Sequence, residues 1–255
     1  MDFDLERNFL VKFIEPQFTE STLDGDLFFK RNGHFIELEE KQLKAGIGDK
    51  REGAWTRVLD PGTNKMIIIT ENGQEIPLNF KKGVFRTSYS NLKHLPICCF
   101  VSLNLGRDFD IDMENNNATL KENLNIELVN QFAGRDLIFF ANPEELIKRV
   151  HSACDRDDMN LLRGLVKYYD DKNEPHPLSE KDYDEAPHKG LLYKRKFFEF
   201  QREYRIVLKK ILEDDYILNI GTLRDIAYNL GPVNHGEDLF KIKISKQKKS
   251  KGLLE

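Results

Sequence analysis

Residues 193–208 place aromatic and charged side chains directly before a strand pattern, and this stretch constrains the fold more than any other. From residue 204 on, alternate positions are apolar, which is typical of a strand with one face in a core. If the extended backbone reaches back to Gln201, then Gln201, Glu203 and Arg205 project from the opposite face. A surface edge strand could carry such a row. A merely solvated row would not need the neighbouring aromatic residues, so we expect these polar side chains to lie at the rim of a core. These aromatic residues are Phe197, Phe198, Phe200 and Tyr204.

The other periodic segments predict an α+β fold with mainly antiparallel or mixed sheets and a few peripheral helices. Residues 96–103 are apolar almost throughout and are the best candidate for a central strand. Residues 9–14 read as a first strand, in which Lys12 is either an edge charge or a group aimed into a cleft. Helices are expected from Pro143, after the capping residue Asn142, and over residues 223–230.

The length of 255 residues and the 40% hydrophobic content suffice for one large domain or two small ones. Because no linker is rich in Gly, Pro or Ser, we expect a single domain over residues 1–255. Asn72-Gly73 is a strong turn signal between two apolar runs and predicts a β-hairpin insertion near residues 64–85. The polar segment at residues 170–190 precedes Glu203, and its length is typical of a lid-like or disordered loop.

Composition excludes several classes of protein. A formal net charge of -4 is too even to indicate a nucleic-acid binder. The adjacent Cys98 and Cys99 suit buried thiols better than disulfides, and no Cys/His spacing suggests zinc. The alternating Asp108, Asp110 and Asp112 lack the glycine and glutamate of a calcium loop, so we expect no metal. No signal peptide or membrane-spanning run is visible, so the expected compartment is the cytoplasm, without a membrane partner.

Gln201-x-Glu203 at the start of a late strand resembles the Q/E-x-E motif of ADP-ribosyltransferases. The order of segments is also similar: an early strand with a basic residue, here Lys12, a middle strand with a hydroxyl, here Ser102, and then the glutamate strand. The layout further resembles a bacterial family with an early Asp/Glu loop, a Cys-Phe-x-Ser strand and a late Lys-aromatic-x-x-Glu-x-Glu-x-Arg segment. Here these segments are residues 48–53, 99–102 and 198–205, and the resemblance spans roughly residues 10 to 210.

The resemblance implies an ADP-ribosyltransferase-like split β core that uses NAD as its substrate. Cleavage of the nicotinamide–ribose bond develops oxocarbenium character, which the carboxylate of Glu203 would stabilise. Gln201 could orient the acceptor nucleophile. Arg205 could pair with the pyrophosphate or simply neutralise Glu203. The resemblance gives Lys12 and Ser102 roles at the cofactor, and Phe100 could stack on nicotinamide or pack in the core.

Similar proteins occur among toxins and phage-defence systems, which implies a nucleic-acid (RNA or DNA) or protein acceptor and allows an antitoxin partner. Two alternatives stay open. A metal-dependent nuclease would need clustered carboxylates with a lysine, and Glu203-x-Arg205 lacks the lysine. A non-catalytic binding module of ADP-ribosyltransferase-like shape would show a filled or collapsed cleft around Glu203.

Overall fold

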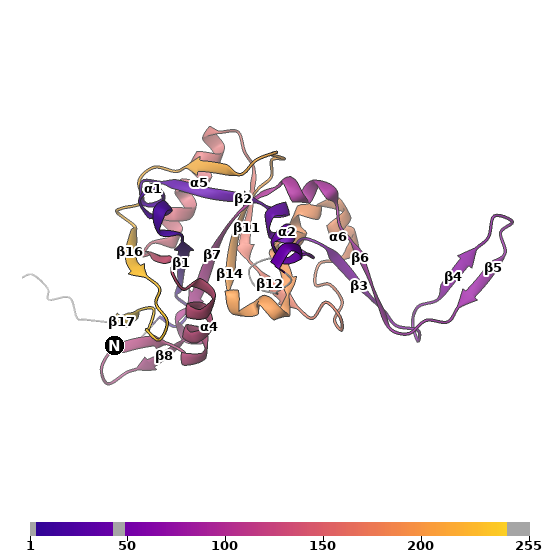
Figure 1. Cartoon of the computed structure of the whole chain (residues 1–255), viewed down its shortest axis with the longest axis horizontal. Helices are drawn as coiled ribbons and strands as arrows, with labels where there is room; N and C mark the ends of the chain where they lie inside the picture. The colour runs from indigo at the N-terminus through magenta and orange to yellow at the C-terminus, as the bar shows by residue number, and fades with distance from the viewer. Residues whose placement is uncertain (1–3, 43–48, 244–255) are drawn as a thin grey trace, which may run out of the picture.

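The computed structural model of the chain describes residues 4–42 and 49–243 (Figure 1). Its centre is an eight-stranded sheet whose neighbouring strands run antiparallel. The predicted α+β architecture with mainly antiparallel sheets is confirmed. The main path of the sheet runs through β11 (Leu161–Leu165), β14 (Glu203–Leu208), β7 (Pro96–Asn104), β1 (Asn8–Ile14), β10 (Asp136–Phe140) and β16 (Ala227–Pro232), and β2 (Asp26–Arg31) and β15 (Tyr216–Asn219) complete it.

Two helices cover the two faces of this sheet. The longer, α5 (Pro143–Arg156), buries Leu146 and Val150 in the core on one face. It begins as predicted, because the side chain of Asn142 accepts a hydrogen bond from the Glu145 N–H and Pro143 occupies the first turn. On the other face, α4 (Glu122–Phe132) packs into a second core. The sheet is therefore buried on both sides, as the apolar sequence of β7 requires.

Short elements surround the main sheet. The smaller helices are η1 (Pro16–Phe18), α1 (Thr19–Leu23), α2 (Asn32–Gln42), η2 (Ser90–His94), α3 (Leu105–Asp108), α6 (Glu180–Glu185), η3 (Pro187–Leu192) and η4 (Lys196–Gln201). The smaller sheets pair β12 (Lys167–Tyr169) with β13 (Tyr193–Arg195), and β17 (Lys241–Lys243) with β9 (Asn117–Leu120) and β8 (Phe109–Asp112). The β12–β13 pair is parallel.

One edge of β7 is shared by two different strands. β1 pairs with it as far as Val11, opposite Val101, and β2 pairs with it from Lys30, opposite Ile97. Between these two pairings, no strand within the described residues pairs with this edge of β7, so its backbone groups need another partner. Lys12 supplies one, because its Nζ donates a hydrogen bond to the carbonyl of Cys99 at 3.0 Å. The sheet thus splits where the first-strand lysine lies.

A two-stranded arm extends far from the body of the protein (Figure 1). Its base is the pair β3 (Trp55–Leu59) and β6 (Gly83–Thr87), and its outer part is the pair β4 (Met66–Ile69) and β5 (Glu75–Leu78). The turn expected at Asn72-Gly73 joins β4 to β5, and Gly73 adopts a φ of 80° that favours glycine. All residues of β4 and β5 are exposed.

Residues 170–190 fold against the base of this arm. The segment contains α6 and the start of η3, and the indole N–H of Trp55 donates to the carbonyl of Leu178 at 2.9 Å. The hydroxyl of the buried Tyr183 donates to the carbonyl of Gly53 at 2.8 Å. These bonds give the segment a fixed position beside the loop at residues 49–53, and it is not the structureless loop that its polar sequence predicted.

The prediction of a helix over residues 223–230 is wrong. The chain turns at residues 224–226 and then enters β16, where Ala227 pairs with Phe140 and Asn229 with Ile138. The pairing with β10 supplies the backbone hydrogen bonds that a short isolated helix would have to make by itself. Tertiary pairing therefore overrides the local helical pattern.

Candidate functional site

Glu203 and Arg205 project from the same face of β14, as the alternation predicted, but Gln201 reaches them by a different route. It lies at the end of the 3₁₀ helix η4, and Arg202 between them has a left-handed φ of 48°. The extended backbone therefore does not run back to Gln201, and that expectation is wrong. Gln201 nevertheless points to the same place, because its Oε1 accepts a hydrogen bond from Lys194 Nζ at 2.8 Å.

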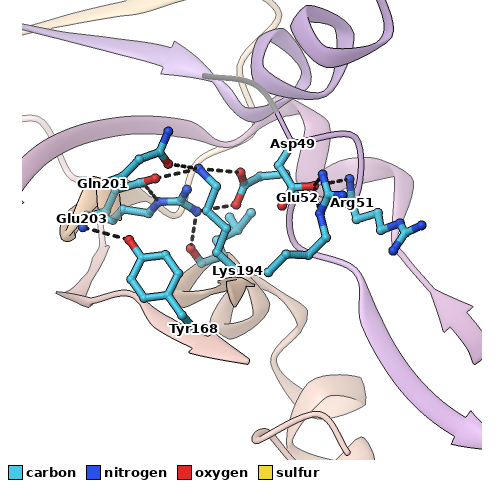
Figure 2. A network of polar contacts seen from close by, with 10 residues as sticks. Asp49, Arg51, Glu52, Tyr168, Lys194, Gln201 and Glu203 are labelled. Atoms are coloured by element: carbon cyan, nitrogen blue, oxygen red, sulfur yellow. Dashed lines mark hydrogen bonds and ion pairs between the residues drawn. The ribbon is translucent and has the colours of Figure 1, made fainter. Parts of the chain in front are cut away.

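The side chains of Glu52, Lys194, Gln201, Glu203 and Arg205 form a buried charge cluster (Figure 2). Lys194 Nζ donates to Glu203 Oε1 at 2.6 Å, and Arg205 Nε donates to Glu203 Oε2 at 2.6 Å. Arg205 Nη1 donates to Glu52 Oε1 at 2.5 Å. Two carboxylates thus share two cations, and each charge is compensated within the cluster.

The two carboxylates of the cluster differ in their pKa values. Burial by itself would raise the pKa of Glu203, but Arg205 and Lys194 outweigh burial and lower it to about 2. Burial raises the pKa of Glu52, and the opposing effects of Arg205 and Lys194 do not cancel it. Among the described residues, no donor hydrogen-bonds Glu52 Oε2, and Lys194 Nζ lies 3.7 Å from this oxygen. Glu203 is therefore the firmly ionised member of the pair.

A second layer of ion pairs fixes the loop that supplies Glu52. Arg195 Nη2 lies 2.7 Å from Asp49 Oδ1, and the backbone N–H of Arg51 donates to the same oxygen at 2.9 Å. The guanidinium of Arg51 pairs in turn with Asp171. The Asp/Glu loop at residues 49–52 and the late Glu-x-Arg strand, far apart in the sequence, thus meet in one network (Figure 2).

A cavity of about 470 Å³ opens beside this cluster. The cavity lies where the split between β1 and β2 leaves the edge of β7 without a paired strand among the described residues. One part of its wall is formed by Lys194, Gln201, Glu203 and Arg205. The rest of the wall consists of Lys12, Phe13, Ile14, Glu15, Phe18, Phe28, Lys30, Phe35, Ile97, Cys99, Phe100, Val101, Phe132 and Arg135. Among the described residues lining the cavity, none belongs to the 170–190 segment, so that segment does not cover Glu203 as a lid in this structure.

The cavity combines aromatic rings with an excess of cations. Its wall contains more lysine and arginine than glutamate side chains, and the stacked pair of Phe13 and Phe132, with centroids 4.2 Å apart, belongs to it. Arg135 stands over the ring of Phe132 at 5.7 Å. Such a wall suits a ligand that carries negative charge together with a flat ring.

The structure brings most of the predicted site residues to this cavity. Glu203, Gln201 and Arg205 line it, and so do Lys12 and Phe100. Lys12 Nζ lies 4.9 Å from the centroid of Phe100 and donates to Cys98 Sγ at 3.3 Å as well as to the Cys99 carbonyl. Phe100 is fully buried and packs edge-on against Phe140, so its ring serves mainly the core.

Ser102 lies elsewhere. Val101 is the residue of β7 that pairs with Glu203, so its neighbour Ser102 projects from the opposite face of the sheet. It is buried, it is opposite Leu10 of β1, and it is absent from the described residues that line the cavity. The middle-strand position nearest the glutamate is therefore occupied by an apolar side chain rather than a hydroxyl.

Sequence reasoning missed Lys194 as a site residue. Its Nζ bonds both Gln201 and Glu203, and it lies over the ring of Phe198 at 4.6 Å. In the sequence it was one of three consecutive basic residues, which more often indicate a solvated surface. The aromatic residues that follow were the available signal, because a lysine buried to 3% exposure needs both apolar packing and an acidic partner.

Neither metal nor membrane features emerge from the parts of the chain that the structure describes. Within residues 4–42 and 49–243, no group of three or more His, Cys, Asp or Glu side chains is arranged to hold a metal ion. No helix in the same residues combines the length and the apolar character needed to cross a bilayer. The carboxylates nearest Glu203 bind basic side chains instead.

Comparison with known proteins gives no family for this chain. No family model matches it, and the searches of curated proteins and of solved structures found no match either.

Proposed function

We propose that this protein is an NAD-dependent ADP-ribosyltransferase whose substrate occupies the cavity beside Glu203. The observation that carries the proposal is the position of one ionised carboxylate on the wall of a cavity of about 470 Å³ that is rich in aromatic rings and cations. NAD offers the matching chemistry, since it has two flat rings and a pyrophosphate. The split edge of β7 and the resemblance of the Gln201-x-Glu203 motif agree with this choice.

The proposed reaction breaks the bond between nicotinamide and ribose C1. Nicotinamide leaves with the bonding electrons, positive charge develops on the ribose, and a nucleophile of the acceptor bonds C1 and loses its proton. Glu203 would stabilise that charge, because Lys194 and Arg205 hold the carboxylate ionised and fix its orientation. Each carboxylate oxygen accepts one of these bonds and retains a lone pair for a ribose hydroxyl.

Other side chains would place the two substrates. Gln201 and Glu203 accept hydrogen bonds from the same Lys194 Nζ, so the Gln201 amide lies beside the carboxylate and would orient the acceptor. Arg205 already binds Glu203, Glu52 and the Leu191 carbonyl, so it neutralises the cluster and has few donors left for a pyrophosphate. Lys12 and Arg135 are the better candidates for that charge, since both line the cavity.

The acceptor in this proposal is a nucleic acid or a protein. A role as a toxin or phage-defence effector, with an antitoxin partner and a place in the cytoplasm, follows from the resemblance of the motifs alone. The formal net charge of -4 does not select between the acceptors. Labelled NAD incubated with cell lysate, with RNA and with DNA would identify the class of acceptor.

The decisive experiment compares Glu203→Gln with Glu52→Gln. Both variants remove one buried carboxylate that pairs with Arg205, so both lose stability, but only Glu203 lines the cavity. We expect Glu203→Gln to abolish nicotinamide release while Glu52→Gln retains a measurable part of it, with folding monitored by circular dichroism. The proposal fails if wild type releases no nicotinamide and transfers no label with any acceptor, or if Glu203→Gln behaves as wild type.

A non-catalytic binding module is the second candidate. The open cavity beside Glu203 is not the filled cleft expected of such a module, but the ion pairs at both oxygens of Glu203 favour it. In that case the cluster is a structural anchor for the cavity. The protein would then bind NAD in a calorimetric titration without ever releasing nicotinamide, and Glu203→Gln would change affinity no more than Glu52→Gln does.

A further inference from the structure

The outer part of the arm exposes apolar side chains on both of its faces. Met66, Ile68, Ile76 and Leu78 share one face and are each between 39% and 47% exposed. On the other face, Ile69 is 65% exposed. A two-stranded hairpin is marginal by itself, and a patch of this kind marks a contact surface. The segment from residue 65 to 78 contains no aromatic residue and one basic residue, which suits neither a nucleic acid nor a membrane surface.

The two edges of the hairpin are not equivalent. Thr70 N–H donates to the Gln74 carbonyl at 3.0 Å, so Thr70 and Gln74 form a hydrogen-bonded pair. Because such pairs alternate in an antiparallel ladder, Ile68 with Ile76 is the next one, and Ile67 with Pro77 is a non-hydrogen-bonded pair. Pro77, which has no N–H, therefore faces outward and protects the β5 edge. Strand β4 contains no proline and no charged residue. The backbone N–H and C=O groups of Ile67 and Ile69 point away from β5 along its free edge.

We propose that β4 pairs with β4 of a second copy of this chain, antiparallel and about a two-fold axis, to form a dimer. The strand Met66–Ile69 is self-complementary, since every side chain in it is apolar. The outward N–H and C=O groups of Ile67 and Ile69 can bond those of the partner when Ile67 lies opposite the partner's Ile69. In this register Ile68 lies opposite the partner's Ile68, on the two-fold axis. It also brings Lys65 next to the partner's Glu71, which adds opposite charges at both ends.

This pairing stops at two copies. The resulting four-stranded sheet has the order β5–β4–β4–β5, and Pro77 protects each outer edge against a third copy. The arm extends away from the body, so the two bodies lie at opposite ends and do not collide (Figure 1). A single strand edge buries less than the roughly 800 Å² per partner of a standard interface, so the dimer is reversible and depends on concentration.

Ile67→Pro tests the edge directly. The Ile67 N–H faces away from β5, so proline there leaves the hairpin bonds intact and copies the protection that Pro77 gives to β5. We expect full-length wild type to approach twice the chain mass of 29.8 kDa over a concentration series in analytical ultracentrifugation, and Ile67→Pro to remain at the mass of one chain. A wild type that stays at one chain mass throughout, or an Ile67→Pro variant that associates equally well, overturns the proposal.

Cysteine trapping tests the register. Ile68→Cys puts two thiols opposite each other at the axis, in a non-hydrogen-bonded pair with Cα atoms roughly 4.5 Å apart, which a disulfide can bridge. Ile76→Cys is the matched control, since it has the same face and similar exposure but lies on β5. Under mild oxidation we expect at least tenfold more crosslinked dimer from Ile68→Cys. Equal crosslinking of the two variants would show contact through the face, and not through the β4 edge.

Discussion

The buried charge cluster and the β4–β5 arm place their side chains in opposite ways. In the cluster, Lys194 and Arg205 are 3% and 2% exposed, whereas in the arm Ile68 and Ile69 are 47% and 65% exposed. Buried charges and exposed apolar side chains are both unfavourable unless the charges are paired and the apolar surface is covered. The cluster is compensated within the molecule, because its charges pair with one another. The apolar side chains of β4 and β5 are left exposed by the part of the chain that the structure describes.

This difference teaches where to look for function. A buried cluster whose charges pair with one another gives little net stability compared with apolar packing, and its value lies in fixing the position of Glu203 on the cavity wall. An exposed apolar edge adds no stability to the single folded chain, and it becomes useful only in a contact with another chain. The first region organises chemistry inside the molecule, and the second organises association outside it.

Removing one cation from the cluster is the strongest test of the comparison. Arg205→Met leaves Glu203 and Glu52 with Lys194 alone, so we expect the free energy of unfolding to fall by about 3–5 kcal/mol in urea titrations. Arg224→Met is the control, because Arg224 pairs with Glu20 and Asp24 at the surface and should cost about 0–1 kcal/mol. Equal costs would mean that the cluster does not depend on internal pairing.

The pH dependence of stability sharpens the same point. The pKa of Glu203 is about 2 in the folded protein and 4.5 in an ordinary exposed glutamate, so the unfolded chain binds its proton first as pH falls. Stability from Glu203 is thus complete above 4.5 and is lost as pH falls toward 2, with a slope of about 1.4 kcal/mol per pH unit. In urea titrations across this pH range, the free energy of unfolding of Glu203→Gln should depend on pH less steeply than that of the wild type, by up to about 1.4 kcal/mol per pH unit. An unchanged slope would show that the ion pairs do not hold Glu203 ionised.

The split in the sheet allows a test of intermediate size. Lys12→Met keeps the stem of the side chain but leaves the Cys99 carbonyl without its donor, so we expect a loss of about 1–3 kcal/mol. Lys30→Met is a suitable reference, since Lys30 also lines the cavity but its Nζ contacts His34 instead of the backbone. Thermal and urea unfolding would measure both, and a smaller loss for Lys12→Met than for Lys30→Met would contradict the role of Lys12 at the split.

The smallest effect is expected at the arm. Ile68→Thr should change the free energy of unfolding of the dilute protein by less than about 0.5 kcal/mol, because its side chain is already half exposed. The same change at the fully buried Ile206 creates a void and buries a hydroxyl, which should cost about 2 kcal/mol or more. Comparable losses in urea titrations would show that the arm is packed against the body, contrary to its exposure.

The sequence anticipated features that depend on local pattern. Apolar continuity identified β7 as the central strand, alternation placed Glu203 and Arg205 on one face, and Asn72-Gly73 located the turn of the arm. It failed where the partner of a segment decides its structure. Residues 227–230 became part of strand β16 because β10 was available to pair with them, and residues 170–190 became ordered against the arm base.

The site itself was only partly visible in the sequence. Gln201 and Glu203 were recognised as a pair, but the extended backbone assumed between them is a 3₁₀ helix followed by a left-handed residue. The hydroxyl of Ser102 was expected near them, and the register of β7 against β14 turns it to the other face. Lys194 escaped notice because a lysine in a basic run gives no sign of burial.

Periodicity and turn chemistry are properties of neighbours along the chain, so the sequence alone determined strands β1, β7 and β14, the capped helix α5, the hairpin turn and the α+β class. The tertiary structure alone decided that Glu52 and Lys194 meet Glu203 and Arg205, that the sheet splits at Lys12, and that a cavity opens there. Those outcomes depend on register and on pairings between residues far apart in the chain. Burial then determines which charges must be paired, and no local pattern records it.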